Sequence, residues 1–408
     1  MSRPPPPRCP HLPLHGAGRW KCLPFFLRLG LTSFGGPTAH LGYFQTEFVQ
    51  RRRWLSDAHY AELVALCQFL PGPASSQVGM ALGQWRAGWA GMAAAWLGFT
   101  LPSALALVAL AVGLSNTPHL AYSGLLHGLK LVAVAVVAHA VWGMARSLCP
   151  DLWRRALAVV ACAALLAWPQ ASVQLGVIAL GAAAALLRQP TEPPVNTSAW
   201  PTSSRARRTG YALLYLFALL LIALPVAAAL WPHTALQAFA AFYQAGALVF
   251  GGGHVVLPLL QTAVVPNGWV AADSFVAGYA AAQAVPGPLF TLAAYLGALL
   301  PLGPAWSPWM GGLLMLLAIF LPATLLVAGA LPLWAQLRQR PHMRQAVTGI
   351  NAVVVGILAA TWYHPVLTSA IGSLLDVGVA LLYLGLLLWR LPPVAVVALA
   401  AGLGWVLA

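Results

Sequence analysis

The amino-acid sequence predicts an all-α polytopic membrane protein built as two homologous halves that insert in opposite orientations. Three observations predict it: an apolar composition, a set of Gly- and Pro-rich motifs that occurs twice, and basic residues in opposite loops of the two halves. Of the 408 residues, 60% are hydrophobic and 7% are charged, whereas a soluble domain carries about 25% charged residues. Lipid is therefore the expected solvent for most of this chain.

The charged residues also restrict the function. Lys and Arg total 21 residues against 7 Asp and Glu residues, a net charge of +14. Because the basic residues cluster at the ends of apolar runs, they are typical of cytoplasmic loops and do not predict nucleic-acid binding. The sequence contains no phosphate-binding loop, dinucleotide fingerprint or haem-attachment motif, and its five cysteines have no metal-ligand spacing. We therefore expect no cofactor and no metal, and ATP-driven pumping is disfavoured.

An ordered set of short motifs occurs once in each half of the chain. Phe34-Gly35-Gly36 recurs as Phe250-Gly251-Gly252, and Gln68 with Pro71-Gly72-Pro73 recurs as Gln283 with Pro286-Gly287-Pro288. Further pairs at nearly the same offset are Trp54 with Trp269, Leu101-Pro102 with Leu321-Pro322, and Gly128 with Gly349. Agreement in order and spacing predicts two homologous halves. The expected organisation is a cytoplasmic N-terminal tail (1–22), a first membrane half (23–187), a cytoplasmic linker (188–209) and a second membrane half (210–408).

Loops at equivalent places in the two halves have opposite charge character. Residues 51–53 are three arginines, whereas the matching residues 261–272 contain no Lys or Arg. Later in each half the bias reverses, since residues 115–126 contain no Lys or Arg and their counterpart contains Arg338, Arg340 and Arg344. Basic loops stay in the cytoplasm. The two halves are therefore expected to form an inverted repeat, as in many secondary transporters.

The same charges predict broken helices at the motifs. Residues 23–49 and 58–84 each run between basic segments and have a break near the middle, at Gly35-Gly36-Pro37 and at Pro71-Gly72-Pro73. Proline donates no backbone hydrogen bond, and glycine tolerates turns that other residues do not. We therefore expect two re-entrant helical hairpins in each half, followed by two full spans and a final apolar pair.

Broken helices at membrane depth favour the binding of an anion. Their free backbone N–H groups must be satisfied by protein or by a polar cavity, and helix N-termini carry partial positive charge and free donors. Lys130 adds a charge within an apolar span, where charge is usually functional. Further side chains close to the breaks are His40, Ser75, Ser76 and Thr291. A second interpretation of the motifs, as tight turns with small-residue helix contacts, stays open.

The motifs of both halves, the arginine run followed by Trp54, and the Leu-Pro step resemble the chromate ion transporter (CHR) family in its long two-domain form. The likeness extends from about Phe26 to Tyr363. One departure is that Gly253-His254 stands in the second half where the first has Pro37-Thr38, so the two halves are expected to contribute unequally. The candidate substrate-binding residues are Phe34, Gly35, Gly36, Pro37, Gln68, Pro71, Gly72, Pro73, Lys130, Phe250, Gly251, Gly252, His254, Gln283, Pro286, Gly287 and Pro288.

The resemblance implies a secondary transporter that exports chromate across the bacterial inner membrane and confers chromate resistance, with sulfate as a chemical analogue and competitor. The expected partners are chromate and membrane lipid, without nucleic acid, and a homodimer is an arrangement that the sequence leaves open. Membrane potential and proton antiport both stay open as energy sources. The alternatives are a carrier of sulfate or another oxyanion, an intramembrane enzyme, and a non-transporting membrane subunit. We expect no enzyme, because His40 with Glu47, the nearest approximation to a catalytic pair, lacks a counterpart in the second half.

The inverted topology predicts which face of the membrane each loop reaches. Single cysteines placed at Ser56 and Asn267, in a background without the five native cysteines, should react with a membrane-impermeant thiol reagent from opposite faces. Labelling of whole cells and of everted vesicles measures this, and labelling of both positions from the same face would contradict the inversion.

Overall fold

The computed structural model describes residues 20–34, 36–116, 119–188, 204–250, 253–334, 341–389 and 391–406. Every regular element within these ranges is helical, and none of them is a strand, which confirms the predicted all-α class. Outside the described residues lie three predicted site residues, Gly35, Gly251 and Gly252, together with residues 1–19 of the expected tail and 189–203 of the expected linker.

In the first half, the helices end and begin at the repeated motifs. The elements are α1 (Leu23–Thr32), α2 (Gly36–Phe44), the π-helical η1 (Gln45–Arg51), α3 (Asp57–Phe69), α4 (Ala74–Asn116), α5 (His119–Leu148), α6 (Leu152–Ala167) and α7 (Ala171–Leu186). The Phe-Gly-Gly motif separates α1 from α2, and the Pro-Gly-Pro motif separates α3 from α4. Helix α4 has a kink at Ala87 and Gly88, where both residues leave helical backbone angles. The kink divides a short arm after the Pro-Gly-Pro motif from a long apolar span.

The second half repeats this order after one additional helix, α8 (Ser204–Leu230). The elements that follow are α9 (Thr234–Leu248), η2 (Gly253–Val255), α10 (Val256–Val264), α11 (Ala272–Ala284), η3 (Leu289–Thr291), α12 (Leu292–Leu299), α13 (Pro308–Ala330), η4 (Leu331–Leu333), α15 (Pro341–Thr361), η5 (Trp362–Leu367), α16 (Thr368–Ala370), α17 (Leu374–Leu388) and α18 (Pro393–Val406). The breaks again lie at the two motifs, between α9 and η2 and between α11 and η3.

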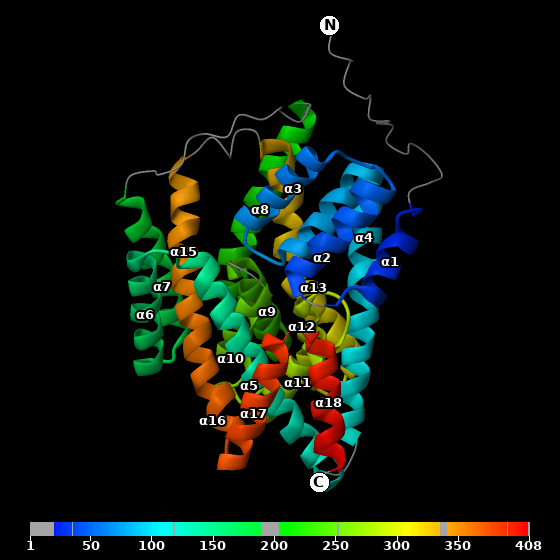
Figure 1. Ribbon diagram of the computed structural model, residues 1–408. Helices are drawn as coiled ribbons and strands as arrows, with labels where there is room; N and C mark the ends of the chain where they lie inside the picture. Colours follow the sequence, from blue (N-terminus) through cyan, green and yellow to red (C-terminus); the bar gives the residue numbers. More distant parts are fainter. Residues whose placement is uncertain are drawn as a thin grey trace, which may run out of the picture.

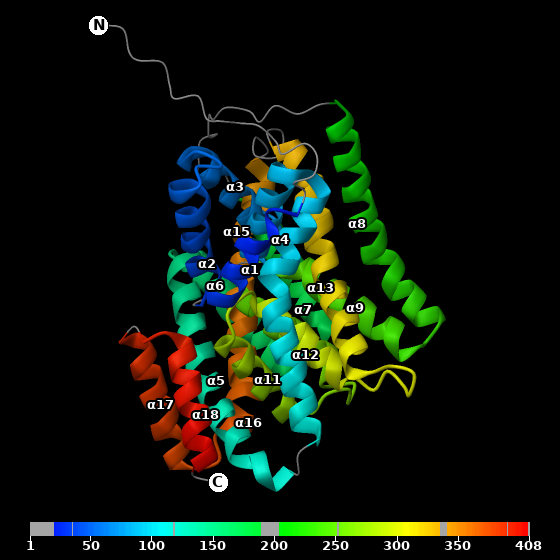
Figure 2. The ribbon, with the colours of Figure 1, turned by 90° about the vertical axis from the view of Figure 1, so that its right-hand side faces the viewer.

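Five helices within the described ranges are long and apolar enough to cross a membrane: Ala74–Leu114, His127–Leu148, Ser204–Leu230, Pro308–Leu333 and Gln345–Ala370. The chain is thus a multi-pass membrane protein. Helices α2 and α3 lie in the upper part of the molecule and α10 and α11 in the lower part (Figure 1). Helix α8 lies at one side, remote from the α17–α18 pair (Figure 2), and only 6% of its most apolar stretch is buried by the protein.

The final helices of each half pack against the other half. Helix α5 contacts α17 and α18, whereas α15 contacts α6 and α7. The repeated glycines lie at these contacts: a Cβ added to Gly128 on α5 would overlap the carbonyl of Ala400, and one added to Gly349 on α15 would overlap the carbonyl of Gly181. Small residues let helix backbones approach closely in a membrane. At both places, therefore, helices of one half pack against helices of the other half.

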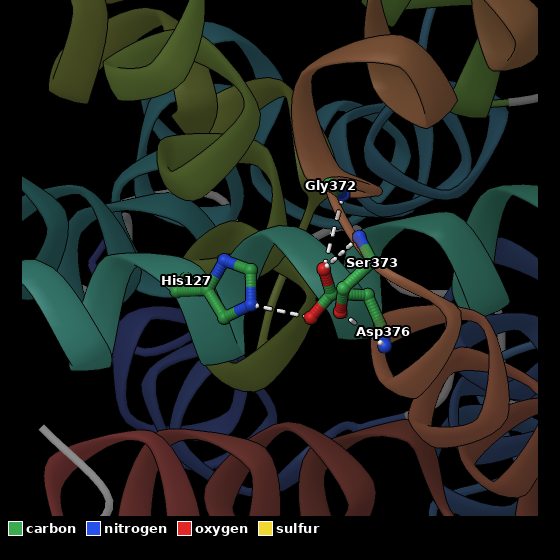
Figure 3. A network of polar contacts seen from close by, with 4 residues as sticks. All are labelled: His127, Gly372, Ser373 and Asp376. Atoms are coloured by element: carbon green, nitrogen blue, oxygen red, sulfur yellow. Dashed lines mark hydrogen bonds and ion pairs between the residues drawn. The ribbon is translucent and has the colours of Figure 1, made fainter.

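A polar network fixes the start of α17 on α5 (Figure 3). The Asp376 carboxylate accepts the backbone N–H groups of Gly372 at 3.0 Å and Ser373 at 2.9 Å, and the Ser373 hydroxyl accepts the N–H of Asp376 at 3.2 Å. These bonds form a capping box, which satisfies free donors at a helix start. The second carboxylate oxygen lies 2.7 Å from His127 Nε2 on α5, so the cap also holds the two helices together.

Enlarging a glycine at a helix contact is expected to destabilise the protein. A Cβ at Gly356 on α15 would overlap the carbonyl of Ala158 on α6, so Gly356→Leu should cost about 1–3 kcal/mol. Gly378→Leu on α17 is the matched control, because a Cβ there meets no atom within 4 Å. Thermal unfolding of the detergent-purified variants measures the difference, and equal melting temperatures would contradict this account of the α6–α15 contact.

Candidate functional site

Two backbone hydrogen bonds between the halves join the four helix breaks. The N–H of Gly72 donates to the carbonyl of Val249 at 2.7 Å, and the N–H of Gly287 donates to the carbonyl of Ser33 at 2.9 Å. Ser33 and Val249 each come directly before the Phe-Gly-Gly motif of their own half. Each Pro-Gly-Pro motif therefore binds the Phe-Gly-Gly break of the opposite half. We call this pair of bonds the cross-half clamp.

The clamp explains why its two donors are glycines. Gly72 has φ 121° and Gly287 has φ 107°, a left-handed region that disfavours residues with a Cβ. Space is also restricted: a Cβ on Gly72 would lie 3.2 Å from Ala323 Cβ, and one on Gly287 would lie 2.9 Å from Ser103 Oγ. Ala323 and Ser103 directly follow the Leu-Pro steps of their halves. The third repeated motif thus also packs against the opposite half.

A cavity of about 410 Å³ lies where the two Phe-Gly-Gly motifs meet. Gly36 and Pro37 line it from the first half, and Gly253, His254 and Gln283 line it from the second. The two motifs are in direct proximity, since a Cβ on Gly253 would lie 3.4 Å from Pro37 Cγ. Four predicted site residues, Gly36, Pro37, His254 and Gln283, are therefore brought together around one space.

The other walls of the cavity come from α5 and the final helix pair. Helix α5 contributes His139 and Ser147, and Leu387 with Pro393 contributes the apolar side. Among the described residues that line it, none is Asp, Glu, Lys or Arg. The cavity thus offers imidazole, amide and hydroxyl groups, together with the backbone N–H of Gly36 at the start of α2, which has no partner within the helix. Neutral donors without a competing carboxylate suit an anionic ligand.

The contacts of His254 define where its ring can donate. The hydroxyl of Tyr279 lies 2.7 Å from His254 Nδ1, and the amide Nε2 of Gln283 lies 3.2 Å from the same atom. Both groups can donate to Nδ1, so the neutral ring has its proton on Nε2. The second-half motif therefore carries an oriented N–H donor, which the matched Thr38 of the first half cannot reproduce.

The remaining predicted residues that the structure describes lie outside the cavity, in four places. The two Pro-Gly-Pro motifs form the clamp and do not line the cavity. Phe34 and Phe250 are half-buried and do not line it either, and Gln68 is exposed on α3. Lys130 is paired instead with Asp273 at the start of α11, with Nζ 3.1 Å from Oδ1. The structure thus does not place Lys130 at the cavity.

The sequence reasoning missed His139 and Ser147, which line the cavity from α5. His139 had a detectable signal, since it interrupts an otherwise apolar run over residues 131–141. Ionisable residues within such runs usually face the protein interior and are functional. Ser147 gave no comparable signal, because its place at the cavity depends on how α5 packs against the motifs.

The two halves pack against each other through their final helices, their helix breaks are joined by hydrogen bonds, and a donor-lined cavity lies between their motifs. Together these features define a membrane transporter with an internal repeat. The chain belongs to the chromate transporter family, whose family model matches residues 20–187 and 236–405. Membership in a family of transport proteins also confirms that the chain is not an enzyme. Helix α8 lies between the two matched regions.

Three similar proteins cover most of the chain. It is 29% identical to the chromate transport protein of Pseudomonas aeruginosa over 413 residues, covering 93% of this chain and 90% of that protein. It is 29% identical to the probable chromate transport protein of Synechococcus elongatus, covering 82% and 81%. It is 28% identical to the chromate transport protein of Cupriavidus metallidurans, covering 88% and 84%. No solved structure matches the chain.

The clamp predicts that Gly287→Ala disturbs the contact between the halves. Gly303→Ala is the matched control, because Gly303 also has a left-handed φ of 101° but its Cβ would meet no atom within 4 Å. Both variants should lose about 1–2 kcal/mol from backbone strain, and Gly287→Ala should lose more because Ser103 must move. Thermal unfolding measures both, and an equal loss would contradict the close approach at Gly287.

Proposed function

We propose that this protein is a secondary transporter that exports chromate from the cytoplasm across the bacterial inner membrane and so confers chromate resistance. The observation that carries the proposal is the cavity between the two Phe-Gly-Gly motifs, which is lined by donors and by no described carboxylate. The names of the similar proteins, which are chromate transport proteins, support chromate as the cargo.

Each polar group of the cavity has a role in binding the anion. A tetrahedral dianion presents oxygen acceptors in four directions, so donors are needed from several elements. His254 and the Gln283 amide line the cavity from the second half, His139 from α5, and the N–H of Gly36 from the first half, while the Ser147 hydroxyl, which donates to the Gly143 carbonyl, can rotate toward the anion. Helix N-termini favour such anions through their free N–H groups and partial positive charge.

A count of spans supports the inverted topology when each motif segment is a re-entrant hairpin. A hairpin or a helix pair returns the chain to the side where it started, and so do two full spans. Only an additional span between the halves can move the second half to the opposite side. Helix α8, which lies between the two family-matched regions, supplies that span. In this arrangement the arginines at 51–53 and those at 338–344 both face the cytoplasm, as the positive-inside rule requires.

Alternating access follows from the same geometry. The cavity lies between motifs of opposite halves, so a rocking of one half against the other opens it to one face of the membrane at a time. Export of a dianion from a cytoplasm held negative is favourable by about 4.6 kcal/mol per 100 mV. The membrane potential alone is therefore sufficient to drive export.

A second candidate cargo is sulfate or another tetrahedral oxyanion. Imidazole, amide and hydroxyl donors bind oxygen acceptors of any such dianion, and the cavity contains no feature that separates them by chemistry alone. Discrimination must then come from the size of the cavity. Competition between the two anions distinguishes these cargoes.

Uptake of radiolabelled chromate into energised everted vesicles tests the function. Chromate should accumulate above vesicles that lack the protein, and Gly72→Leu, which breaks the clamp, should abolish the accumulation. Excess sulfate as competitor reports the selectivity. Accumulation no greater than in control vesicles, for chromate and for other oxyanions, would refute the transporter proposal for these cargoes.

The cavity assignment predicts the effect of Gln283→Leu. Gln283 is half-buried, and loss of its donor costs roughly 1–3 kcal/mol, so the chromate concentration at half-maximal rate should rise roughly tenfold or more. Gln68→Leu, at the matched position of the first half, should change this concentration less, because Gln68 does not line the cavity. Initial rates over a range of chromate concentrations measure both, and a larger effect at Gln68 would contradict the assignment.

A further inference from the structure

The first half contains a cluster of buried polar residues that the mechanism above does not use. Each of its members is at most 3% exposed: Ser33, His40, Ser75, Ser76, Thr100 and Ser103. They surround the first-half side of the clamp, since Ser33 accepts the Gly287 N–H and Ser103 lies beside Gly287. We call these six residues the polar cluster.

The second half builds the same backbone without this polarity. By the offsets of the repeated motifs, the matched residues are Val249, Val256, Phe290, Thr291, Phe320 and Ala323. Five of these six are apolar, and Thr291 donates locally to the carbonyl of Pro288 at 2.7 Å. Because the clamp forms equally well with apolar side chains, the polar cluster is not needed to build it. Polar groups are costly to bury, so a function is the expected reason for their presence.

His40 is the titratable member of the cluster and lies at its centre. Its Nε2 is 3.2 Å from the carbonyl oxygen of Ser33, and its Nδ1 is 3.3 Å from the hydroxyl of Ser75. The ring also packs edge-on against Phe99, with 5.1 Å between the ring centroids. The Ser33 carbonyl thus accepts both from His40 and from Gly287 across the clamp. A change at His40 is therefore transmitted directly to the contact between the halves.

The geometry around His40 satisfies two protonation states. A carbonyl can only accept, so Nε2 carries a proton in the neutral ring and Nδ1 accepts from the Ser75 hydroxyl. When Nδ1 binds a second proton, the Ser75 hydroxyl rotates and accepts instead. No heavy atom has to move for this exchange. The hydroxyls of Ser33, Ser76 and Thr100 have no hydrogen-bond partner among the described residues, so they remain available to water or to the Ser75 proton.

Among the described residues, no charged group is in direct contact with His40. Its hydrogen-bond and ring contacts are to Ser33, Ser75 and Phe99, none of which is charged. The titratable and charged groups on α2 and the neighbouring elements are Arg28 on α1, Tyr43 on α2, Glu47 and Arg51 on η1, Asp57, His59, Tyr60, Glu62 and Cys67 on α3, and Arg86 on α4. Glu47 is bonded to Arg52 at 2.7 Å, Tyr60 donates to the Leu41 carbonyl, and Arg86 lies over the Trp54 ring.

An anion in the cavity would supply the missing counter-charge. His40 lies on α2 one helical turn after Gly36 and Pro37, which line the cavity. A dianion there favours the protonated ring, because opposite charges attract strongly in a poorly solvated interior. Occupancy of the cavity and protonation of His40 are thus linked through a single helical turn.

We propose that His40 is a proton-binding residue of the transport cycle, so that one proton moves together with each dianion. This proposal rests on the proposed transport function. A proton from water on the loading side adds to the Nδ1 lone pair when the anion enters, and the imidazolium returns it to water on the opposite side when the anion leaves. The charge carried per cycle is then reduced by one, and the first half carries the coupling.

Calorimetric titration of the purified protein with sulfate and with chromate tests this link. At alkaline pH both anions are dianions, so any proton taken up on binding belongs to the protein. Titrations in two buffers with different ionisation enthalpies should give uptake approaching about one proton per anion for the native protein. His40→Gln keeps a donor to Ser33 and an acceptor for Ser75 but does not titrate. It should bind the anions with no coupled proton uptake.

Two further variants separate the proton site from a structural effect. His364→Gln changes an exposed histidine on η5 and should retain the proton uptake of the native protein. Ser75→Ala keeps the imidazole but removes the partner of Nδ1, so uptake should persist with a shifted pH dependence. Thermal unfolding establishes that each variant is folded.

Three results would overturn the proposal. Full proton uptake in a folded His40→Gln variant would exclude His40 as the site. Anion binding by the native protein without proton uptake would exclude coupling while leaving the transport function intact. Failure of the native protein to bind either anion, with no transport in vesicles, would remove the transport function and this inference with it.

Discussion

The cross-half clamp is the interaction on which the arrangement of the molecule depends. A helix that breaks inside a membrane exposes backbone groups that lipid cannot satisfy. Here the carbonyls before each Phe-Gly-Gly motif, at Ser33 and Val249, accept N–H groups from the Pro-Gly-Pro motif of the other half. Neither half can satisfy its own breaks in this way. The halves also depend on each other away from the clamp, because α5 packs against α17 and α18, and α15 packs against α6 and α7.

The clamp is also compatible with the inverted topology proposed above. Its two bonds are equivalent under exchange of the halves, and the matched glycines, carbonyls and Leu-Pro neighbours repeat on each side. In the inverted topology proposed above, this exchange corresponds to an axis in the membrane plane, as in inverted-repeat transporters. Helix α8 is largely unburied by protein and lies outside both family-matched regions. In the proposed topology its contribution is one additional crossing, and no described residue of α8 lines the cavity.

The helix breaks could be predicted from the sequence because proline and glycine act locally. Helix α1 ends at Thr32 and α3 at Phe69, next to the predicted motifs. The contacts between halves could not, because no local rule relates Gly72 to Val249. The partner of a charged residue within a span could not be predicted from the sequence either. Lys130 lies within an apolar run, yet the packing of the helices brings it to Asp273 at the start of α11. His139 lines the cavity for the same kind of reason, through the packing of α5.

The two halves have equivalent backbone contacts at the clamp but different side chains around it. A symmetric clamp needs only glycine donors and carbonyl acceptors, so side chains around it are free to differ. The second half supplies the oriented imidazole of His254, held by Tyr279 and Gln283 at the cavity. The first half supplies His40, which lies behind the cavity and against the clamp. In the proposed transport cycle, His254 faces the anion, whereas His40 binds a proton next to the Ser33 carbonyl that also accepts the Gly287 N–H of the other half.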